Sequence, residues 1–265
     1  REVVKESDGK VWLRCGSGET WDDIVAYAVE KGWHGAENLS LIPGEVGASA
    51  VQNIGAYGAE AKDLITKVEA VAIATGNVVE FSNEDCRYAY RQSRFKNEWK
   101  DHYVITYVTY CFSLDFCPDL DYGNIRHSLE EQGISKPTAQ QLRQTIINIR
   151  EAKLPDPKVT GNAGSFFMNP VVGRDVYERL AAQYEGMPHY VVDADHIKIP
   201  AGWMIEQCGW KGASLGRAGV HDRQALVLVN RGGATGEEVV TLYKRIIEDV
   251  RAKFGIEIHP EVNVI

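Results

Sequence analysis

Long apolar runs and an excess of positive charge are both missing from this 265-residue sequence. No apolar stretch approaches the ~18 residues that a membrane-spanning helix needs, so no membrane contact is expected. The formal net charge is −8, because 37 acidic residues outnumber 29 basic ones. Nonspecific binding to nucleic acid is therefore not expected, and an anionic ligand would need a local group of basic side chains.

Cysteine is scarce and follows no spacing typical of a metal site or a disulfide framework. The five cysteines are scattered, without a CxxC pair or a Cys/His cluster: Cys15, Cys86, Cys111, Cys117 and Cys208. An odd, scattered set is typical of a reducing compartment, which predicts a cytoplasmic protein with no bound metal. Residues 1–10 lack a signal-peptide pattern. The GxGxxG and GxxxxGK[ST] motifs are also missing, so neither a Rossmann nor a P-loop site is indicated.

Helical and strand-like segments are mixed along the chain, which predicts an α+β fold of two domains. β-rich runs predict strands at 10–15, 68–74, 78–81, 103–114, 226–230 and 257–265. Helical spacing predicts helices at 21–31 (capped by Thr20), 138–153, 175–185, 203–208 and 237–254. The two prolines in LPDP cannot extend a helix, which predicts a domain boundary after residue 153. The second domain would begin near Val159.

A Gly- and Ala-rich stretch occupies residues 42–60. Its glycines at 44, 47, 55 and 58 would let the backbone approach a ligand closely. Gln52 and Asn53 carry both donors and acceptors, which suit a planar heterocycle. The alternative interpretation is a tight structural loop.

A basic segment rich in tyrosine follows at residues 87–96, RYAYRQSRFK. A guanidinium such as that of Arg91 is well shaped to bind a carboxylate. The alternative is a solvated basic turn on an acidic protein.

Ser165 lies between a flexible Gly-Asn-Ala-Gly turn and two phenylalanines, which would hold its hydroxyl in a partly dry pocket. The surrounding residues do not form a GxSxG elbow, so we interpret Ser165 as a proton donor or hydrogen-bonding group rather than a nucleophile. A capping serine is the alternative. Taken singly, Glu261 would be a surface residue and His221 a structural histidine.

Six strings occur in one order along the chain: IPGEVGASAVQNIGAYG, YAYRQSRFK, LPDPKVTGNAGSFFMNP, GWMIEQCGWKG, HDRQALVLVN and HPEV. In this combination the sequence resembles the UDP-N-acetylenolpyruvoylglucosamine reductase family over nearly its whole length. GNAGSFF and QNIGAYG are highly specific. Tyr122, within Asp-Tyr-Gly, resembles the substrate-covering tyrosine loop of the longer, type I branch.

The resemblance implies an NADPH- and FAD-dependent enzyme of peptidoglycan precursor synthesis. The family reduces UDP-N-acetylglucosamine enolpyruvate to UDP-N-acetylmuramate, with NADPH as hydride donor and FAD as carrier. The implied fold is of the vanillyl-alcohol-oxidase type. Residues 1–153 would be the second FAD-binding subdomain, 154–257 the substrate-binding domain, and 258–265 a terminal strand returning to the active site. A monomer is expected.

The site residues follow from the same resemblance. Ser165 would donate a proton, while Arg91 and Glu261 would stabilise enolate-like charge on the substrate carboxylate. Glu261 would have to carry a proton or pair with Arg91 to help rather than repel. The residues expected to hold the UDP-sugar are Tyr122, Lys153, Asn169 and Gln224. Those expected at the flavin are Pro43, Gly44, Gly47, Ala48, Gln52, Asn53 and Gly58.

The sequence departs from the family pattern in two places. The N-terminal subdomain, whose Gly-rich loop cradles the FAD pyrophosphate, is expected to be missing before Arg1, so weakened retention of FAD is expected. Met168 stands where relatives can carry a lysine, which predicts the loss of one polar contact.

Two other functions stay open. Another FAD-linked oxidase or dehydrogenase of the same superfamily would share the Gly/Ala-rich stretch but has no need to combine Ser165, Arg91 and Glu261. Residues 42–58 contain no His or Cys that could attach a flavin covalently. A nonenzymatic UDP-sugar-binding remnant would bind the sugar nucleotide without oxidising NADPH.

Overall fold

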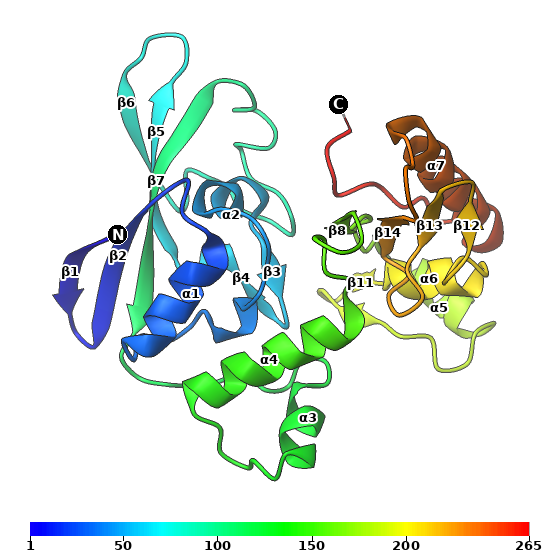
Figure 1. Ribbon diagram of the computed structural model, residues 1–265, viewed down its shortest axis with the longest axis horizontal. Coiled ribbons are helices and arrows are strands. Elements are labelled where there is room, and N and C mark those ends of the chain that lie inside the picture. Colours follow the sequence, from blue (N-terminus) through cyan, green and yellow to red (C-terminus); the bar gives the residue numbers. More distant parts are fainter. Residues whose placement is uncertain (265) are drawn as a thin grey trace. The chain divides into compact units, whose positions relative to one another are not determined.

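The computed structural model describes residues 1–264, and the chain forms two compact units, Arg1–Arg150 and Glu151–Ile265. Both units contain sheet and helices (Figure 1), so the predicted α+β class is confirmed. No helix in the described part of the chain is long and apolar enough to cross a membrane. Within residues 1–264, no three His, Cys, Asp or Glu side chains are grouped as metal ligands.

The first unit is built on a five-stranded antiparallel sheet with the order β1-β2-β7-β5-β6. Its strands are β1 (Glu2–Ser7), β2 (Lys10–Gly16), β5 (Ile65–Ala72), β6 (Val78–Ser82) and β7 (Tyr103–Ser113). In β2 every second residue is buried, as expected for a strand with one face on the core. β5 and β6 form the predicted hairpin, and its turn holds Gly76 at φ +69°. The predicted strands of this unit are confirmed.

Two helices pack on this sheet. α1 (Trp21–Glu30) and α2 (Val46–Gln52) share one cluster of buried apolar residues with the strands. The indole of Trp21 meets the ring of Tyr110 edge-on, at 5.3 Å between centroids, and donates a hydrogen bond to Leu39 O. α1 begins at Trp21 as predicted, but the side chain of Thr20 does not cap it. Thr20 instead forms an isolated backbone bridge with Glu45, directly before α2.

A smaller helical excursion follows β7. α3 (Ile125–Glu131) and α4 (Ala139–Lys153) form a separate apolar cluster of buried residues: Ile125, Leu129, Leu142, Ile146 and Ile149. The sequence pattern does not predict α3, because seven residues are too few for a clear helical period. α4 is joined to α1 by Arg143, whose guanidinium donates two hydrogen bonds of 2.7 and 2.8 Å to the Asp22 carboxylate.

We expect Asp22→Asn to lower the free energy of unfolding by about 2 kcal/mol at pH 7, the scale of hydrogen bonds to charged groups. Burial opposes ionisation of Asp22, but hydrogen bonds from Arg143 and from the Leu41 N–H outweigh it and hold the pKa of the carboxyl below its ordinary 3.8. The ionised form therefore stabilises the fold above the unfolded-state pKa of about 3.9, and this contribution is lost as pH falls through the folded-state pKa.

Chemical denaturation from pH 7 down to pH 3 measures this effect, with Asp23→Asn at the exposed neighbouring position as control. The difference between wild type and Asp22→Asn should shrink below about pH 4. A difference that is independent of pH would show that the lost stability does not come from the charge.

The second unit contains two small antiparallel sheets. Four strands have the order β12-β13-β14-β8 and three have the order β10-β11-β9. The strands are β8 (Asn162–Ser165), β9 (Val171–Gly173), β10 (Tyr190–Val191), β11 (His196–Lys198), β12 (Ser214–Leu215), β13 (Ala218–Val220) and β14 (Val227–Asn230). The helices are α5 (Arg174–Ala181), α6 (Ala201–Gln207) and α7 (Gly236–Phe254). α5 and α7 each begin one residue before the predicted start, and α6 begins two residues before it. A capping box of Thr235 and Glu238 begins α7.

Two local expectations are wrong, and one alternative does not hold throughout. Residues 42–60, for which a tight structural loop is the alternative interpretation, include the helix α2. The Gly-Asn-Ala-Gly segment is not a flexible turn, since β14 supplies partners that make it β8. Residues 257–264 form no strand but an extended chain with a single bridge, Phe167 to Pro260. Pro260 lacks the N–H that a continuous ladder would require. Residue 265 of that expected strand lies outside the described residues.

Candidate active site

The Gly/Ala-rich stretch bends sharply on both sides of α2. Leu41 before it and Asn53 after it have positive φ, 57° and 49°. Gly47 on α2 lies so close to the turn after β2 that a Cβ at this position would be 2.9 Å from Ser17 Cβ. Only glycine allows the backbone of α2 to approach that turn so closely.

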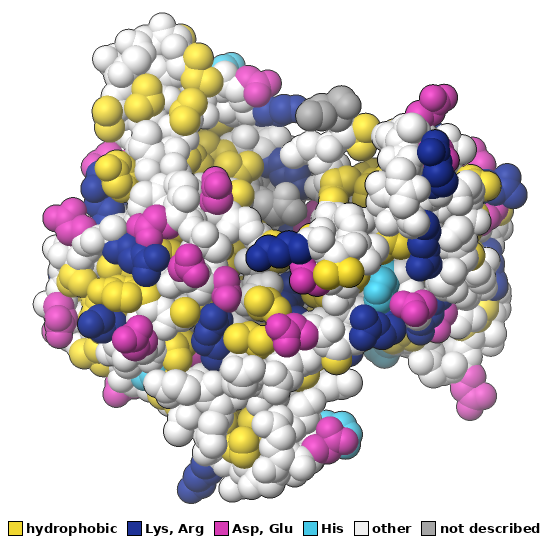
Figure 2. Space-filling model, in the orientation of Figure 1, with side chains coloured by type: hydrophobic (Ala, Val, Ile, Leu, Met, Phe, Trp, Pro, Cys, Tyr) yellow, Lys and Arg dark blue, Asp and Glu magenta, His cyan; other side chains and the backbone are white. Residues whose placement is uncertain are grey.

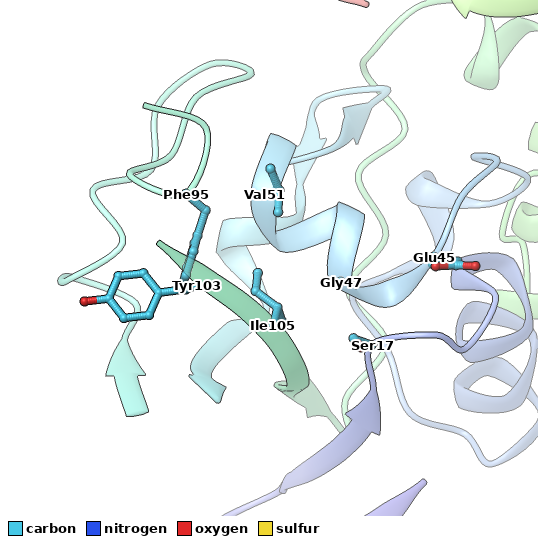
Figure 3. Close-up of a pocket in the computed structure, with 7 residues that line it drawn as sticks. All are labelled: Ser17, Glu45, Gly47, Val51, Phe95, Tyr103 and Ile105. Atoms are coloured by element: carbon cyan, nitrogen blue, oxygen red, sulfur yellow. The ribbon is translucent and has the colours of Figure 1, made fainter. Parts of the chain in front are cut away.

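A cavity of about 240 Å³ lies beside this contact. Its lining residues are Ser17, Glu45, Gly47, Val51, Phe95, Tyr103 and Ile105. Figure 3 shows α2 on one side, with Gly47 and Val51, and β7 on the other, with Tyr103 and Ile105. Ligand pockets are typically ~300–1,000 Å³, so this cavity suits a ring-sized part of a ligand rather than a whole dinucleotide.

The side chain of Asn53, predicted at the flavin, is fully buried. Its amide nitrogen donates to Glu60 Oε2 at 3.1 Å and to Ala89 O at 2.9 Å, and its oxygen accepts the Lys62 N–H at 2.9 Å. The amide therefore ties the end of α2 to the Arg-rich segment. A flavin contact through Asn53 stays a prediction, and it would require this amide to leave those partners. Gln52 beside it is half-buried.

Arg91 lies against the same stretch. Its guanidinium donates to the backbone oxygens of Gly55 and, at 3.4 Å, of Asn53, and it sits 5.0 Å from the centroid of the Tyr90 ring. The backbone of Arg91 has a positive φ of 55°. A predicted anion-binding residue and the predicted flavin stretch are thus brought together within the first unit.

We expect Gly55→Ala to displace the side chain of Arg91, the predicted carboxylate-binding residue, and to slow turnover about tenfold. A Cβ at residue 55 would lie 2.8 Å from Arg91 Nη1 and 2.8 Å from Ala59 O, and the second atom belongs to backbone that cannot easily yield. Steady-state kinetics measure the loss, and Gly18→Ala, where a Cβ would meet no atom within 4 Å, is the matched control. Equal kinetics in both variants would contradict the assigned contact.

The predicted substrate loop also reaches the Gly/Ala-rich stretch. A Cβ at Gly58 would lie 3.5 Å from Tyr122 Cβ and 3.2 Å from Asp119 Oδ2. Gly123 packs on the Tyr57 ring, because a Cβ added to Gly123 would lie 3.6 Å from the nearest carbon of that ring. Tyr122 is therefore packed directly over the tip of the β3–β4 hairpin, formed by Gly55–Ala56 and Ala59–Glu60.

In the second unit, Ser165 and Glu261 lie on adjacent backbone segments. Ser165 ends β8 and is exposed, and its backbone pairs with Val227 of β14. The next residue, Phe166, donates its N–H to Leu226 O and accepts the Glu261 N–H at 2.7 Å. The C-terminal tail is thereby held alongside the segment that follows Ser165, although Phe166 and Glu261 are 95 positions apart in sequence.

Two other predicted substrate residues of this unit, Asn169 and Gln224, contact the start of α6. Asn169 Oδ1 accepts the Ala201 N–H at 2.9 Å, so it caps α6. Gln224 Oε1 accepts the Leu226 N–H at 3.2 Å and lies 3.2 Å from a notional Cβ on Gly202. Lys153, the last residue of α4, is exposed. The backbone of Met168 donates to His259 O at 3.0 Å.

The comparisons with known proteins match both units. Residues 1–82 match the family described as "FAD binding domain", and residues 156–265 match "UDP-N-acetylenolpyruvoylglucosamine reductase, C-terminal domain". A Bacteroides fragilis protein named UDP-N-acetylenolpyruvoylglucosamine reductase is 57% identical over 265 residues, which cover 100% of this chain and 79% of that protein. A Porphyromonas gingivalis protein of the same name is 53% identical over 264 residues, covering 100% and 78%.

The chain belongs to the UDP-N-acetylenolpyruvoylglucosamine reductase family.

The fold agrees with this membership. A crystal structure of UDP-N-acetylenolpyruvylglucosamine reductase from Thermus caldophilus superposes with a TM-score of 0.64, at 22% identity, over 98% of this chain and 74% of that one. The resemblance to the reductase family that the sequence motifs indicate is therefore confirmed. The roles of individual site residues and the domain limits at 153 and 257 stay predictions.

The first unit of this reductase family member fits part of a flavin nucleotide. Gly47 allows α2 to approach the Ser17 turn closely, and the adjoining cavity is lined by the apolar Val51 and Ile105 and by the polar Ser17 and Glu45. Such a mixed, ring-sized cavity suits a heterocycle with a polar edge.

Sequence reasoning missed two residues that shape this site. Asn38 donates to Tyr57 O near the end of the Gly/Ala-rich stretch, and Arg150 donates at 3.3 Å to Leu41 O, directly before that stretch. Burial lowers the pKa of the Arg150 guanidinium, while burial raises that of the Tyr57 hydroxyl beside it. The only signal for Asn38 in the sequence is its place four residues before the IPGEVG string.

Charges of both signs are interspersed on the face of the molecule shown in Figure 2. This agrees with a local anion site rather than a broad basic surface on a protein of net charge −8.

Proposed function

We propose that this chain catalyses the reduction of UDP-N-acetylglucosamine enolpyruvate to UDP-N-acetylmuramate with NADPH and FAD, in peptidoglycan precursor synthesis. The observation that supports the proposal is the backbone hydrogen bond from the Glu261 N–H to Phe166 O, which holds Glu261 alongside the residue that follows Ser165 in a chain of this reductase family. A protein that only bound a nucleotide sugar would not require Ser165 as a general acid.

FAD is the cofactor. Residues 1–82, which match the FAD binding domain family, include α2 and the Ser17 turn. Bound FAD would carry the hydride of NADPH to the substrate. We propose that the residues holding it are Pro43, Gly44, Gly47, Ala48, Gln52, Asn53 and Gly58, together with Ser17 and Val51 of the cavity.

Addition of a hydride to the substrate methylene carbon leaves a carbanion on the adjacent carbon, whose charge spreads into the carboxylate as an enolate. Arg91, fixed by two backbone oxygens, would stabilise that charge, assisted by Glu261 either protonated or paired with Arg91. The Ser165 hydroxyl would then donate a proton to the carbon, which completes the lactyl ether.

The UDP-sugar would be held by Tyr122, Lys153, Asn169 and Gln224, chiefly at its phosphates. Lys153 and Arg91 would give this acidic protein its local positive charge for an anionic ligand. We place the protein in the cytoplasm, as a monomer that does not bind nucleic acid. All five cysteines are unpaired, as expected in a reducing compartment.

The visible spectrum of the chain reconstituted with FAD tests the proposal. NADPH should bleach the flavin absorbance under anaerobic conditions, and the enolpyruvyl sugar nucleotide should restore it. Recovery with another acceptor but not with this substrate would assign the chain to a different FAD-linked reaction. Binding of the UDP-sugar without bleaching of the flavin by NADPH would show that the chain is a binding protein and not an enzyme.

A further inference from the structure

Asn38 joins two loops that are distant in sequence. Its side-chain nitrogen donates to Tyr57 O at 2.9 Å and to Asp119 O at 3.0 Å. Both partners are carbonyl oxygens, which only accept, so the atom that faces them must be the NH₂ group of the amide. The residue is only 6% exposed, which means that water cannot readily replace either bond.

The segment that carries Asn38 is itself rigidly held. Asn38 lies in the short 3₁₀ helix η1 (Glu37–Leu39). The buried Glu37 carboxylate bonds His34 Nδ1 at 2.9 Å and accepts the Gly35 N–H at 2.8 Å. On the other side, Leu39 is fully buried and accepts the Trp21 indole N–H at 3.0 Å. The Asn38 amide therefore projects from a fixed platform.

The first loop that it holds is the tip of the β3–β4 hairpin. Tyr57 and Gly58 at this tip have φ of 47° and 84°, the two positive values that a type I′ turn requires. This tip lies inside the stretch proposed to hold FAD.

The second loop is the connection between β7 and α3, at residues 114–124. Asp119 in this loop accepts the Asp121 N–H at 3.0 Å, directly before Tyr122. The same loop rests on Gly58, with Tyr122 Cβ at 3.5 Å from the notional Gly58 Cβ. Fixing Asp119 therefore fixes the backbone that carries Tyr122.

We propose that Asn38 is a positioning residue that sets the affinity for the UDP-sugar by holding the Tyr122 loop against the Tyr57–Gly58 turn. This inference rests on the proposed function, since Tyr122 is proposed there to contact the sugar nucleotide. Asn38 itself does not touch substrate in this proposal. It acts through the position of Tyr122.

Loss of the amide would leave the Tyr57 and Asp119 carbonyl oxygens without this shared donor. The loop would still be attached, because Phe116 and Leu120 pack on the α3–α4 cluster. We therefore expect the loop to shift rather than to unfold, with an effect on ligand affinity that exceeds its effect on stability.

Asn83 offers a matched control. Its side-chain nitrogen also donates to two backbone oxygens, Lys62 O and Ile65 O, each at 2.8 Å, but neither belongs to the Tyr122 loop. Asn38→Ala and Asn83→Ala thus remove the same kind of bridge from the same unit. Asn38→Ser is the milder variant if Asn38→Ala does not fold.

The test is calorimetric titration of the oxidised, FAD-loaded protein with UDP-N-acetylglucosamine enolpyruvate, without NADPH, so that no turnover occurs. Asn38→Ala should weaken binding about tenfold and Asn83→Ala less than about twofold, with comparable losses of melting temperature. In a Tyr122→Phe background, the effect of Asn38→Ala should fall below about threefold, because the group that it positions is already gone.

Each other outcome is decisive. Equal weakening by the Asn38 and Asn83 variants, or an undiminished effect in the Tyr122→Phe background, would assign Asn38 a purely structural role. Unchanged affinity in Asn38→Ala, with wild-type protein binding the sugar nucleotide, would overturn this inference alone. Failure of the wild-type protein to bind the sugar nucleotide would overturn the proposed function and this inference together.

Discussion

Ser165→Ala should leave bleaching of the flavin by NADPH unchanged while slowing recovery of its colour by the enolpyruvyl substrate at least ~10²-fold, the usual effect of removing a general acid. The substitution deletes one hydroxyl and keeps the backbone pairing of β8 with β14. Gly164, at φ +72°, donates its N–H to Asn162 Oδ1, so the backbone conformation of β8 before Ser165 does not depend on the serine side chain. The loss should therefore be chemical rather than structural.

Stopped-flow absorbance resolves the two phases of this experiment. Ser214→Ala, at an exposed serine on β12 in the same unit, is the control and should behave as wild type. Normal recovery in Ser165→Ala would remove this residue from the mechanism. A loss of both phases would instead point to a defect in binding of the cofactor.

Regular elements with strong patterns could be predicted from the sequence, because their periodicity is local. α7 is one example: its buried residues Leu242, Ile246, Val250 and Phe254 recur at helical spacing, and Thr235 and Glu238 mark its start. The long strand β7 is another, with eleven residues rich in β-branched and aromatic side chains. Both elements were predicted almost to their ends.

Elements that depend on distant partners could not be predicted in this way. β8 is a strand only because β14, some 60 residues later, pairs with a segment whose glycine and asparagine favour turns. The C-terminal tail has strand-like alternation, yet only one bridge forms, because it meets the single segment around Phe167 rather than a full strand.

The candidate site shows the same division. Family motifs identify Ser165, Arg91 and Glu261 as candidate site residues. A motif alone, however, does not show which of its residues contact a ligand and which only stabilise the surrounding backbone. Asn53 illustrates the difficulty, since its amide is fully buried among Glu60, Ala89 and Lys62. Asn38 illustrates the converse, because a residue outside the glycine stretch fixes the turn inside it.

Arg91 should be as important to the second half of the reaction as Ser165, for a different reason. Its guanidinium is oriented by two backbone oxygens, Asn53 O and Gly55 O, so its plane is set before substrate arrives. A preorganised donor of this kind stabilises developing negative charge without reorganising during the reaction. Lysine keeps the charge but has no planar fork that could make both anchoring bonds and still present a second edge to a carboxylate.

We therefore expect Arg91→Lys to slow substrate-dependent recovery of the flavin colour by about 10²-fold, the cost of losing one preorganised oxyanion donor. Arg87→Lys is the matched control, because Arg87 lies in the same basic segment, has a similar positive φ of 46° and is exposed. Retained activity in Arg91→Lys would mean that charge alone suffices and that the anchoring by Asn53 and Gly55 serves only the fold. Equal losses in both variants would instead mean that the basic segment acts as a diffuse field, in which no single arginine addresses the substrate carboxylate.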